Sequence, residues 1–447
     1  MKTVCHSQLS FANLESKALV ADFEGGLITS DAGCLLLREI DLRTGVLTRA
    51  NQAVADPRDP AKIRHAQLDL LRQRVFAIAH GYEDANDHDT LRGDPALKTA
   101  VGRAPVSAAD LASQPTLSRL ENRVTRSQLR RLSDALMDAY LAAHPGPRDL
   151  IVLDIDATDD PTHGRQQLSL FHGYFDQHMF HPLLVLDGVS GFPLAAVLRP
   201  GKCHAAHGAV GILDRILRRL RNAYPQATIL VRADAGFAVP RIYALLESHQ
   251  VRYVIGMIPN PRLRARVTKL VDEVTGAFDA TRQKQRRFTS FRYRADSWPC
   301  SRRVVAKVEH LVKGLNTRFV VTNLVFDPAV EVYDGIYIGR GDAENRIKEW
   351  KSHLKADRTS CHSFRANQFR VLLHTFAYVL LWHLRQSLAG TELAVATFET
   401  LRLNVLKIGA RVRETFRRVV LHLASSYPYR DLLATALANI QLLPLPP

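Results

Sequence analysis

The chain has 447 residues, a formal net charge of +16 at pH 7 and a hydrophobic content of 46%. This length predicts about two to four domains with a buried core, and the hydrophobic content excludes a disordered chain. The excess of lysine and arginine favours a polyanionic partner, nucleic acid before a membrane surface. Basicity alone is weak evidence, so the partner has to be argued from motifs.

The cysteines and the apolar runs indicate in which cellular compartment the protein is found. The five cysteines form no Cys-x-x-Cys pair, which argues against a disulfide framework or a zinc module and fits a reducing cytoplasm. Cys203, His204 and His207 lie close together, but no second half of a zinc site is visible. Residues 1–16 lack the apolar segment of a signal peptide, and the run 371–382 is too short to cross a bilayer. We therefore expect a cytoplasmic protein.

The first third of the chain is predicted to be mostly helical. After a short extended segment, residues 1–148 contain helix starts such as Asp59-Pro60 and apolar side chains at helical spacing over 63–78. A basic cluster follows, which could contact DNA or form a solvated surface, and the pattern does not separate the two. Its members are Arg119, Arg123, Arg126, Arg130 and Arg131.

From residue 149 the pattern changes to short apolar runs rich in β-branched residues. Strands are predicted at 150–157, at 181–201 as a pair, at 227–236 and at 251–258, with helices before and after the fourth strand. The order is three strands, helix, strand, helix and strand. The pattern alone indicates an α/β domain.

Two further regions complete the chain. Residues 262–330 are strongly basic and then strand-like, which predicts a mostly β insertion, and Arg292, Arg294 and Trp298 within it could meet DNA or pack in hairpins. Residues 391–447 are expected to form a helical C-terminal region that is basic around 411–418.

Acidic residues stand where buried strands end. Asp156 closes the first strand and Asp234 closes the fourth, and chain ends of neighbouring strands bring distant residues to one edge. A third acid, Glu344, lies in the stretch 337–351. If that stretch is helical, Arg340, Glu344 and Lys351 fall within roughly 40° of one another. A carboxylate framed by cations suits phosphodiester chemistry, although an ordinary solvated helix gives similar pairs.

The spacing of Tyr337, Arg340, Glu344 and Lys351 reproduces the YREK signature of DDE transposases of bacterial insertion sequences. The sequence around it is similar to the branch called insertion sequence family 1380. This resemblance implies an RNase H-like catalytic core, a mixed sheet flanked by helices in which the first and fourth strands are neighbours. The implied domains are a mostly helical DNA-binding region at 1–148, a catalytic domain at 149–390 with the insertion at 262–330, and the helical region 391–447.

The resemblance also implies the site residues. Asp156, Asp234 and Glu344 would be catalytic and would bind Mg²⁺ or Mn²⁺, two ions about 4 Å apart. Asp154 remains open as the first acid, although Asp156 better fits the family pattern Asp-x-Thr/Ser. The same resemblance implies that Tyr337 and Arg340 would contact phosphates near the cleaved end and that Lys351 would hold the DNA backbone.

The function implied is cut-and-paste DNA transposition. Such a protein would bind terminal inverted repeats in double-stranded DNA, cleave the ends and join them to target DNA, as a homodimer in the DNA complex. Two alternatives stay open: an RNase H-like nuclease that cuts without strand transfer, and a non-catalytic DNA-binding protein on the same scaffold.

Overall fold

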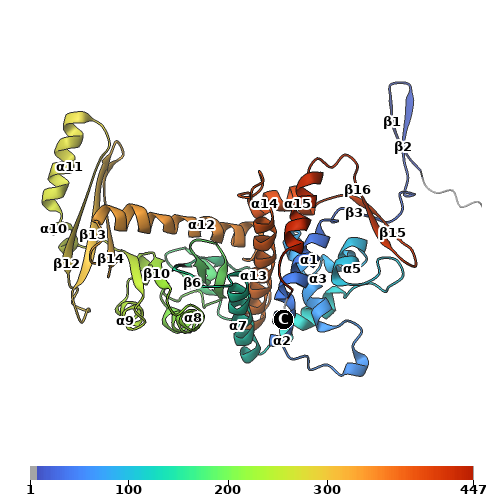
Figure 1. Ribbon diagram of the computed structural model, residues 1–447, viewed down its shortest axis with the longest axis horizontal. Coiled ribbons are helices and arrows are strands. Elements are labelled where there is room, and N and C mark those ends of the chain that lie inside the picture. The colour runs from blue at the N-terminus through green and yellow to red at the C-terminus, as the bar shows by residue number, and fades with distance from the viewer. Residues whose placement is uncertain (1–7, 446–447) are drawn as a thin grey trace, which may run out of the picture. The chain divides into compact units, whose positions relative to one another are not determined.

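The computed structural model describes residues 8–445 (Figure 1). Residues 1–7, with Cys5 and the beginning of the segment examined for a signal peptide, lie outside the described residues, as do 446–447. The chain divides into two compact units, which are described separately. Within the described residues, unit 1 contains 8–51, 56–120 and 383–445, and unit 2 contains 52–55 and 121–382. No helix within 8–445 combines the length and apolar character needed to cross a membrane.

Unit 2 is built on an eight-stranded mixed sheet with the order β12-β13-β14-β11-β10-β4-β8-β9. β10 runs parallel to β4 and β11, whereas β8 is antiparallel to β4 and β9. The first and fourth strands of the core, β4 and β10, are therefore neighbours, which confirms the predicted α/β core. The bounds are β4 (Leu150–Ala157), β8 (Leu183–Asp187), β9 (Pro193–Val197), β10 (Thr228–Ala233), β11 (Arg252–Met257), β12 (Gln285–Tyr293), β13 (Arg302–Leu311) and β14 (Gly314–Thr322).

Both faces of the central strands are buried, as in parallel sheets covered by helices. On one face Val152, Leu230 and Val254 form a core with Val332 and Tyr333, which belong to a helical segment after the sheet. Side chains of the other parity are buried on the opposite face, where α8 (Ala209–Ala223) and α9 (Pro240–Ser248) lie (Figure 1). The side-chain period of two thus assigns each strand residue to a helical layer.

The insertion differs from the expectation in its first part. Residues predicted to be mostly β begin with two helices, α10 (Pro261–Ala265) and α11 (Thr268–Thr281). Asn260 caps α10 by accepting a hydrogen bond from the Leu263 amide at 2.9 Å, with proline at the first helical position. α11 buries Val274 and Phe278, a spacing of four that marks one face of a helix. The three strands that follow extend the core sheet, because β14 pairs with β11.

A helical segment at 331–353 follows the sheet. It comprises a π-helical stretch Glu331–Tyr337, a short 3₁₀ turn Ile338–Arg340, α12 (Gly341–Lys348) and a π-helical stretch Glu349–His353. Changes of hydrogen-bond pattern within one helix are frequent at functional sites. The segment predicted as a helix is therefore helical throughout, although its spacing is not uniformly that of an α-helix.

Long helices and a small sheet support this core. The part of α13 (Phe364–Ser387) within unit 2 is anchored by Trp350, whose indole donates to the Thr375 hydroxyl at 3.1 Å, and by Tyr378, whose hydroxyl donates to the Gly191 carbonyl at 3.2 Å. The other elements are α7 (Arg126–Ala143), β5 (Asp160–Pro161), β6 (Leu170–His172) and β7 (Gln177–Phe180).

Unit 1 combines helices with two small sheets. Its described elements are β1 (Leu9–Leu14), β2 (Lys17–Ala21), β3 (Ile28–Thr29), α1 (Cys34–Thr44), α2 (Val46–Ala53, up to residue 51), a 3₁₀ turn Pro60–Lys62, α3 (Gln67–Ala79), α4 (His88–Leu91), α5 (Pro95–Val101), α6 (Gln114–Arg123, up to residue 120), α14 (Phe398–Leu401), a π-helical turn Arg402–Leu406, β15 (Ala410–Glu414), β16 (Val419–Leu423) and α15 (Arg430–Gln441). The prediction of helix throughout 391–447 is wrong for β15 and β16. Ala410 and Val412 point into the unit while Arg411 and Arg413 point out, a period of two that specifies a strand.

Candidate active site

Two of the predicted acids meet where β4 and β10 end. The parallel ladder pairs Asp154 with Arg232 and Ile155 with Ala233, so one further residue along each strand places Asp234 beside Asp156. The pKa of Asp156 is raised to about 6, because the carboxyl is buried and because the charge of Asp234 opposes its ionisation. Asp234 also accepts a hydrogen bond from the Gly236 amide at 3.0 Å, which fixes the turn after the strand.

Arg340 joins the first and third predicted acids. One guanidinium nitrogen, Nη1, donates to Oδ2 of Asp156 at 3.1 Å, and Nη2 donates to Oε1 of Glu344 at 2.7 Å. The Arg340 side chain is only 16% exposed, whereas that of Glu344 is 61% exposed. The helical segment 331–353 therefore presents its cation inward to the strand ends and its carboxylate toward solvent.

Asp154, the alternative first acid, has a different environment. Its side chain is completely buried and accepts from Arg232 through both oxygens, Nε to Oδ1 at 2.7 Å and Nη2 to Oδ2 at 2.8 Å. Arg232 also donates to the Ile336 carbonyl at 3.1 Å, which ties β10 to the helical segment 331–353. Both oxygens of Asp154 are thus occupied by one guanidinium. The sequence signal for Arg232 was a charged residue inside an apolar strand, which requires a partner.

Two glycines allow the helical segment to approach the sheet closely. A Cβ at Gly256 on β11 would lie 2.6 Å from the Tyr337 hydroxyl oxygen. A Cβ at Gly339 would lie 2.3 Å from Nη1 of Arg232. Tyr337 packs on Tyr333 with ring centroids 5.4 Å apart, and its burial raises the pKa of the phenol. The need for glycine at these two positions cannot be read from the sequence, because only the tertiary contact shows that a side chain would not fit.

Lys351 lies against the segment that follows β4. Its Nζ donates to Oδ1 of Asp159 at 2.6 Å. Burial opposes the ionisation of Asp159, but the hydrogen bond and charge of Lys351 outweigh it and lower the pKa of this carboxyl. The next residue, Asp160, is buried and accepts from the Thr359 hydroxyl at 3.0 Å, and burial raises its pKa to about 8. Each acid that follows Asp156 in this stretch therefore has its own partner.

The donor set suits a hard divalent cation. Asp156 and Asp234 are adjacent carboxylates whose charges oppose each other, and a divalent ion relieves such repulsion. Within residues 8–445 no three His, Cys, Asp or Glu side chains are already arranged around a common point for a metal. The third acid is held by Arg340 instead, so it is the one that has to turn to complete a three-carboxylate set.

Three residues considered as DNA contacts have structural roles. Trp298 is buried between Tyr243 and Tyr293. Arg292 donates to the Ser301 carbonyl at 2.7 Å and Arg294 donates to the Trp298 carbonyl at 3.1 Å. Packing within the hairpin is therefore the arrangement found for all three.

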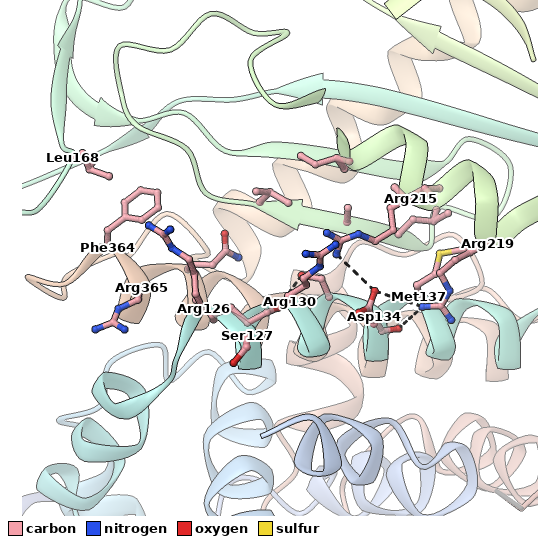
Figure 2. A pocket seen from close by; sticks show the side chains of 18 residues that line it. Arg126, Ser127, Arg130, Asp134, Met137, Leu168, Arg215, Arg219, Phe364 and Arg365 are labelled. Atoms are coloured by element: carbon pink, nitrogen blue, oxygen red, sulfur yellow. Dashed lines mark hydrogen bonds and ion pairs between the residues drawn. The ribbon is translucent and has the colours of Figure 1, made fainter. Parts of the chain in front are cut away.

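A cavity of about 570 Å³ lies apart from the predicted acids, between α7, α8 and β9 (Figure 2). Arg126 and Arg130 of the basic cluster line it together with Arg365, whereas Arg131 donates to the Ala53 carbonyl. Asp134 lies between Arg215 and Arg219 at the same cavity (Figure 2). None of the six predicted site residues lines it, so it is not the candidate active site.

Comparison with known families decides the classification. Residues 11–445 match the family model described as Transposase DDE domain group 1. The chain belongs to this DDE transposase family. Among solved structures it is similar to a chain of the cryo-EM structure of the piggyBac transposase synaptic complex with hairpin DNA. That similarity has 13% identity and a TM-score of 0.43, and covers 93% of this chain and 83% of the other. A search of curated proteins gives no match. The DDE transposase assignment therefore rests on the family model.

Proposed function

We propose that this DDE transposase serves an insertion sequence: it binds terminal inverted repeats, cleaves the ends of the element and joins their 3′-hydroxyl groups to target DNA. The observation that carries the proposal is Arg340, which links Asp156 and Glu344 where Asp234 also lies. Two acids at neighbouring strand ends, and a third on a helix that is tied to them through Arg340, support a site for phosphodiester chemistry once Glu344 turns toward the strand ends.

The finer assignment is to the YREK-signature group, in a branch similar to insertion sequence family 1380. The spacing of Tyr337, Arg340, Glu344 and Lys351 supports it, as does their position along one helical segment beside the strand ends.

We assign the catalytic role to Asp156, Asp234 and Glu344, which would hold two Mg²⁺ or Mn²⁺ ions. When bound, such ions supply activation of water or a 3′-hydroxyl and stabilisation of the leaving oxygen. Asp156 is preferred over Asp154, because Arg232 already occupies both oxygens of Asp154. Arg340 holds Asp156 in position, and release of Glu344 from Arg340 would free both side chains, the carboxylate for metal and the guanidinium for a phosphate.

Tyr337, Arg340 and Lys351 are proposed to contact the DNA backbone near the cut. Lys351 is bound to Asp159, so a phosphate would compete with this carboxylate for the ammonium group. The partner is double-stranded DNA, as terminal repeats and as target. Because two ends must be joined together, we expect a homodimer in the DNA complex.

Cleavage of a labelled fragment that carries the element's end, in Mg²⁺ or Mn²⁺, tests this proposal. Glu344→Gln keeps the shape of the side chain and removes the charge, so we expect intact DNA binding and no cutting. Asp342→Asn is the matched control, since Asp342 is an exposed acid of the same helix that points elsewhere. It should cut as the unaltered protein does.

The outcomes separate the alternatives. Equal cutting by the unaltered protein and Glu344→Gln would show that Glu344 is not catalytic. Cutting without any joined product indicates a nuclease without strand transfer. Metal-independent binding with no cutting by either protein would favour a non-catalytic DNA-binding protein on the same scaffold.

A further inference from the structure

A basic hairpin stands on the surface of unit 1, formed by β15 and β16 and called here the ribbon 410–423. Its inner side is fixed, because Ala410 pairs with Thr29 of β3 and the Val412 amide donates to the Leu27 carbonyl at 2.8 Å. Ala410 and Val412 are buried. The ribbon is therefore a rigid part of unit 1 with one face against its core and the other face in solvent.

The outer face carries cations. Cross-strand pairing sets Arg411 opposite His422 and Arg413 opposite Val420, and all four side chains project to the side opposite Val412. Arg417 and Arg418 lie in the connection between the strands and are exposed. Four arginines are thus placed along one short hairpin.

The single acid of the ribbon is turned away from these arginines. Glu414 accepts hydrogen bonds from the amides of Val106 at 2.7 Å and Ser107 at 3.1 Å, and from the Ser107 hydroxyl. These hydrogen bonds lower the pKa of Glu414. The carboxylate anchors the ribbon to unit 1 rather than neutralising the outer face.

The four arginine side chains are unpaired. Within residues 8–445, the side chains of Arg411, Arg413, Arg417 and Arg418 make no hydrogen bond or ion pair. By contrast, Arg340 and Arg232 form ion pairs with the carboxylates of Asp156 and Asp154. Exposed guanidinium groups without a carboxylate partner are free to bind an anion.

An exposed aromatic residue stands at the end of the ribbon. The Thr415 amide donates to the Arg418 carbonyl at 2.8 Å and the Arg418 amide donates to the Thr415 hydroxyl at 3.1 Å, so Phe416 and Arg417 form the tip. Phe416 is fully exposed. A solvent-exposed phenyl ring beside arginines is suited to stack on, or wedge against, a nucleic-acid base.

We propose that the ribbon 410–423 is a second DNA-binding surface, separate from the candidate active site. Arg411, Arg413, Arg417 and Arg418 bind phosphates, and Phe416 contacts a base at the groove. A two-stranded β-ribbon fits the major groove, and the guanidinium fork matches phosphate geometry. DNA is favoured over an acidic protein because the outer face presents arginines together with an exposed phenyl ring at the tip, the pair of groups that bind phosphates and bases. The proposal rests on the proposed function, which makes DNA the partner.

Binding of a labelled end fragment without divalent ions, over a salt series, tests the proposal on the full chain. The double variants Arg411→Gln/Arg413→Gln and Arg417→Gln/Arg418→Gln should each lower the slope of log K against log salt by about 2, since each lost phosphate contact removes about 0.9. Phe416→Ala should weaken binding roughly five- to a hundredfold with little change of that slope. Thermal unfolding should change little, because these side chains are exposed and make no hydrogen bond or ion pair in the described part of the chain.

The control variant Arg266→Gln/Lys269→Gln removes the same charge from an exposed surface of unit 2. If this control weakens binding as much as the ribbon variants, the effect is one of net charge and the proposal is wrong. The proposal is also wrong if poly-glutamate displaces DNA from the ribbon as efficiently as unlabelled DNA does. If the ribbon variants bind normally while the unaltered protein still cuts ends in Mg²⁺, only the ribbon proposal fails. If the unaltered protein neither binds nor cuts DNA, the proposed function fails first.

Discussion

The cations of the candidate active site and those of the ribbon 410–423 differ in what they touch. At the site, Arg340 binds Asp156 and Glu344, and Lys351 binds Asp159. On the ribbon, the arginines have no carboxylate partner among residues 8–445. The difference shows that positive charge serves two purposes in one protein. The paired cations hold acids and would have to exchange them for a phosphate, whereas the arginines of the ribbon are available to an external polyanion without such an exchange. The number of arginines on a surface therefore does not show whether that surface binds DNA.

Replacing the first proposed catalytic acid should have the largest effect, and that effect should fall on cleavage at the candidate active site and not on the ribbon. Asp156→Asn should reduce end cleavage by on the order of a thousandfold or more, because an amide binds a divalent ion far more weakly than a carboxylate. Cleavage rates at saturating protein measure the effect, with DNA binding as the control for folding. Cleavage that survives Asp156→Asn would remove Asp156 from the proposed metal site.

Breaking the buried pair of Arg232 and Asp154 should act on stability. Arg232→Leu leaves the Asp154 carboxylate buried without its partner, which should cost about 3–5 kcal/mol in the free energy of unfolding. Arg413→Leu on the ribbon should change that free energy by less than about 0.5 kcal/mol, because the arginine is exposed and unpaired. Urea unfolding of both variants measures the contrast. Equal losses in the two variants would contradict the distinction between paired and unpaired cations.

The half-buried pair of Lys351 and Asp159 should have a smaller effect on stability, and this effect should depend on pH. Lys351 lowers the pKa of Asp159 in the folded protein, so this pair contributes stability above the ordinary aspartate pKa of about 3.9 and loses it as pH falls through the lower folded value. Asp159→Asn should therefore cost about 1 kcal/mol or less at pH 7, after allowance for solvent screening, and nothing at the acid end. Unfolding free energies of both proteins, measured from pH 7 down to pH 3, test the sign. A difference that grows as pH falls would refute it.

The sequence predicted the parts of the site that depend on local spacing. Asp156 and Asp234 were found because each ends an apolar run, and such ends meet at a sheet edge. The helical spacing of Arg340 and Glu344 was readable because it needs only the period of one element. Their hydrogen bond at 2.7 Å follows from that spacing.

The remaining features of the candidate site could not be predicted, because they depend on strand register and on contacts between elements that are distant in the sequence. The partner of Asp154 is Arg232 only because β4 and β10 align in one register, which no single segment specifies. The need for glycine at 256 arises from Tyr337, a residue far along the chain. In β15 the arginines that alternate with Ala410 and Val412 mask the period of two, whereas in α11 only Val274 and Phe278 are buried, so its apolar face is too short to stand out.

The pairing of β3 with β15 has a consequence for how the protein is made. Thr29 leaves the ribosome early, yet its partner Ala410 is synthesised only after the whole of unit 2. Domains that consist of one contiguous segment fold in order during translation, and unit 1 cannot do so. The eight-stranded sheet can assemble on the nascent chain while the two earlier segments of unit 1 await its last segment. Closing so long a loop is slow, and translation stalled before residue 410 would leave β3 without its partner.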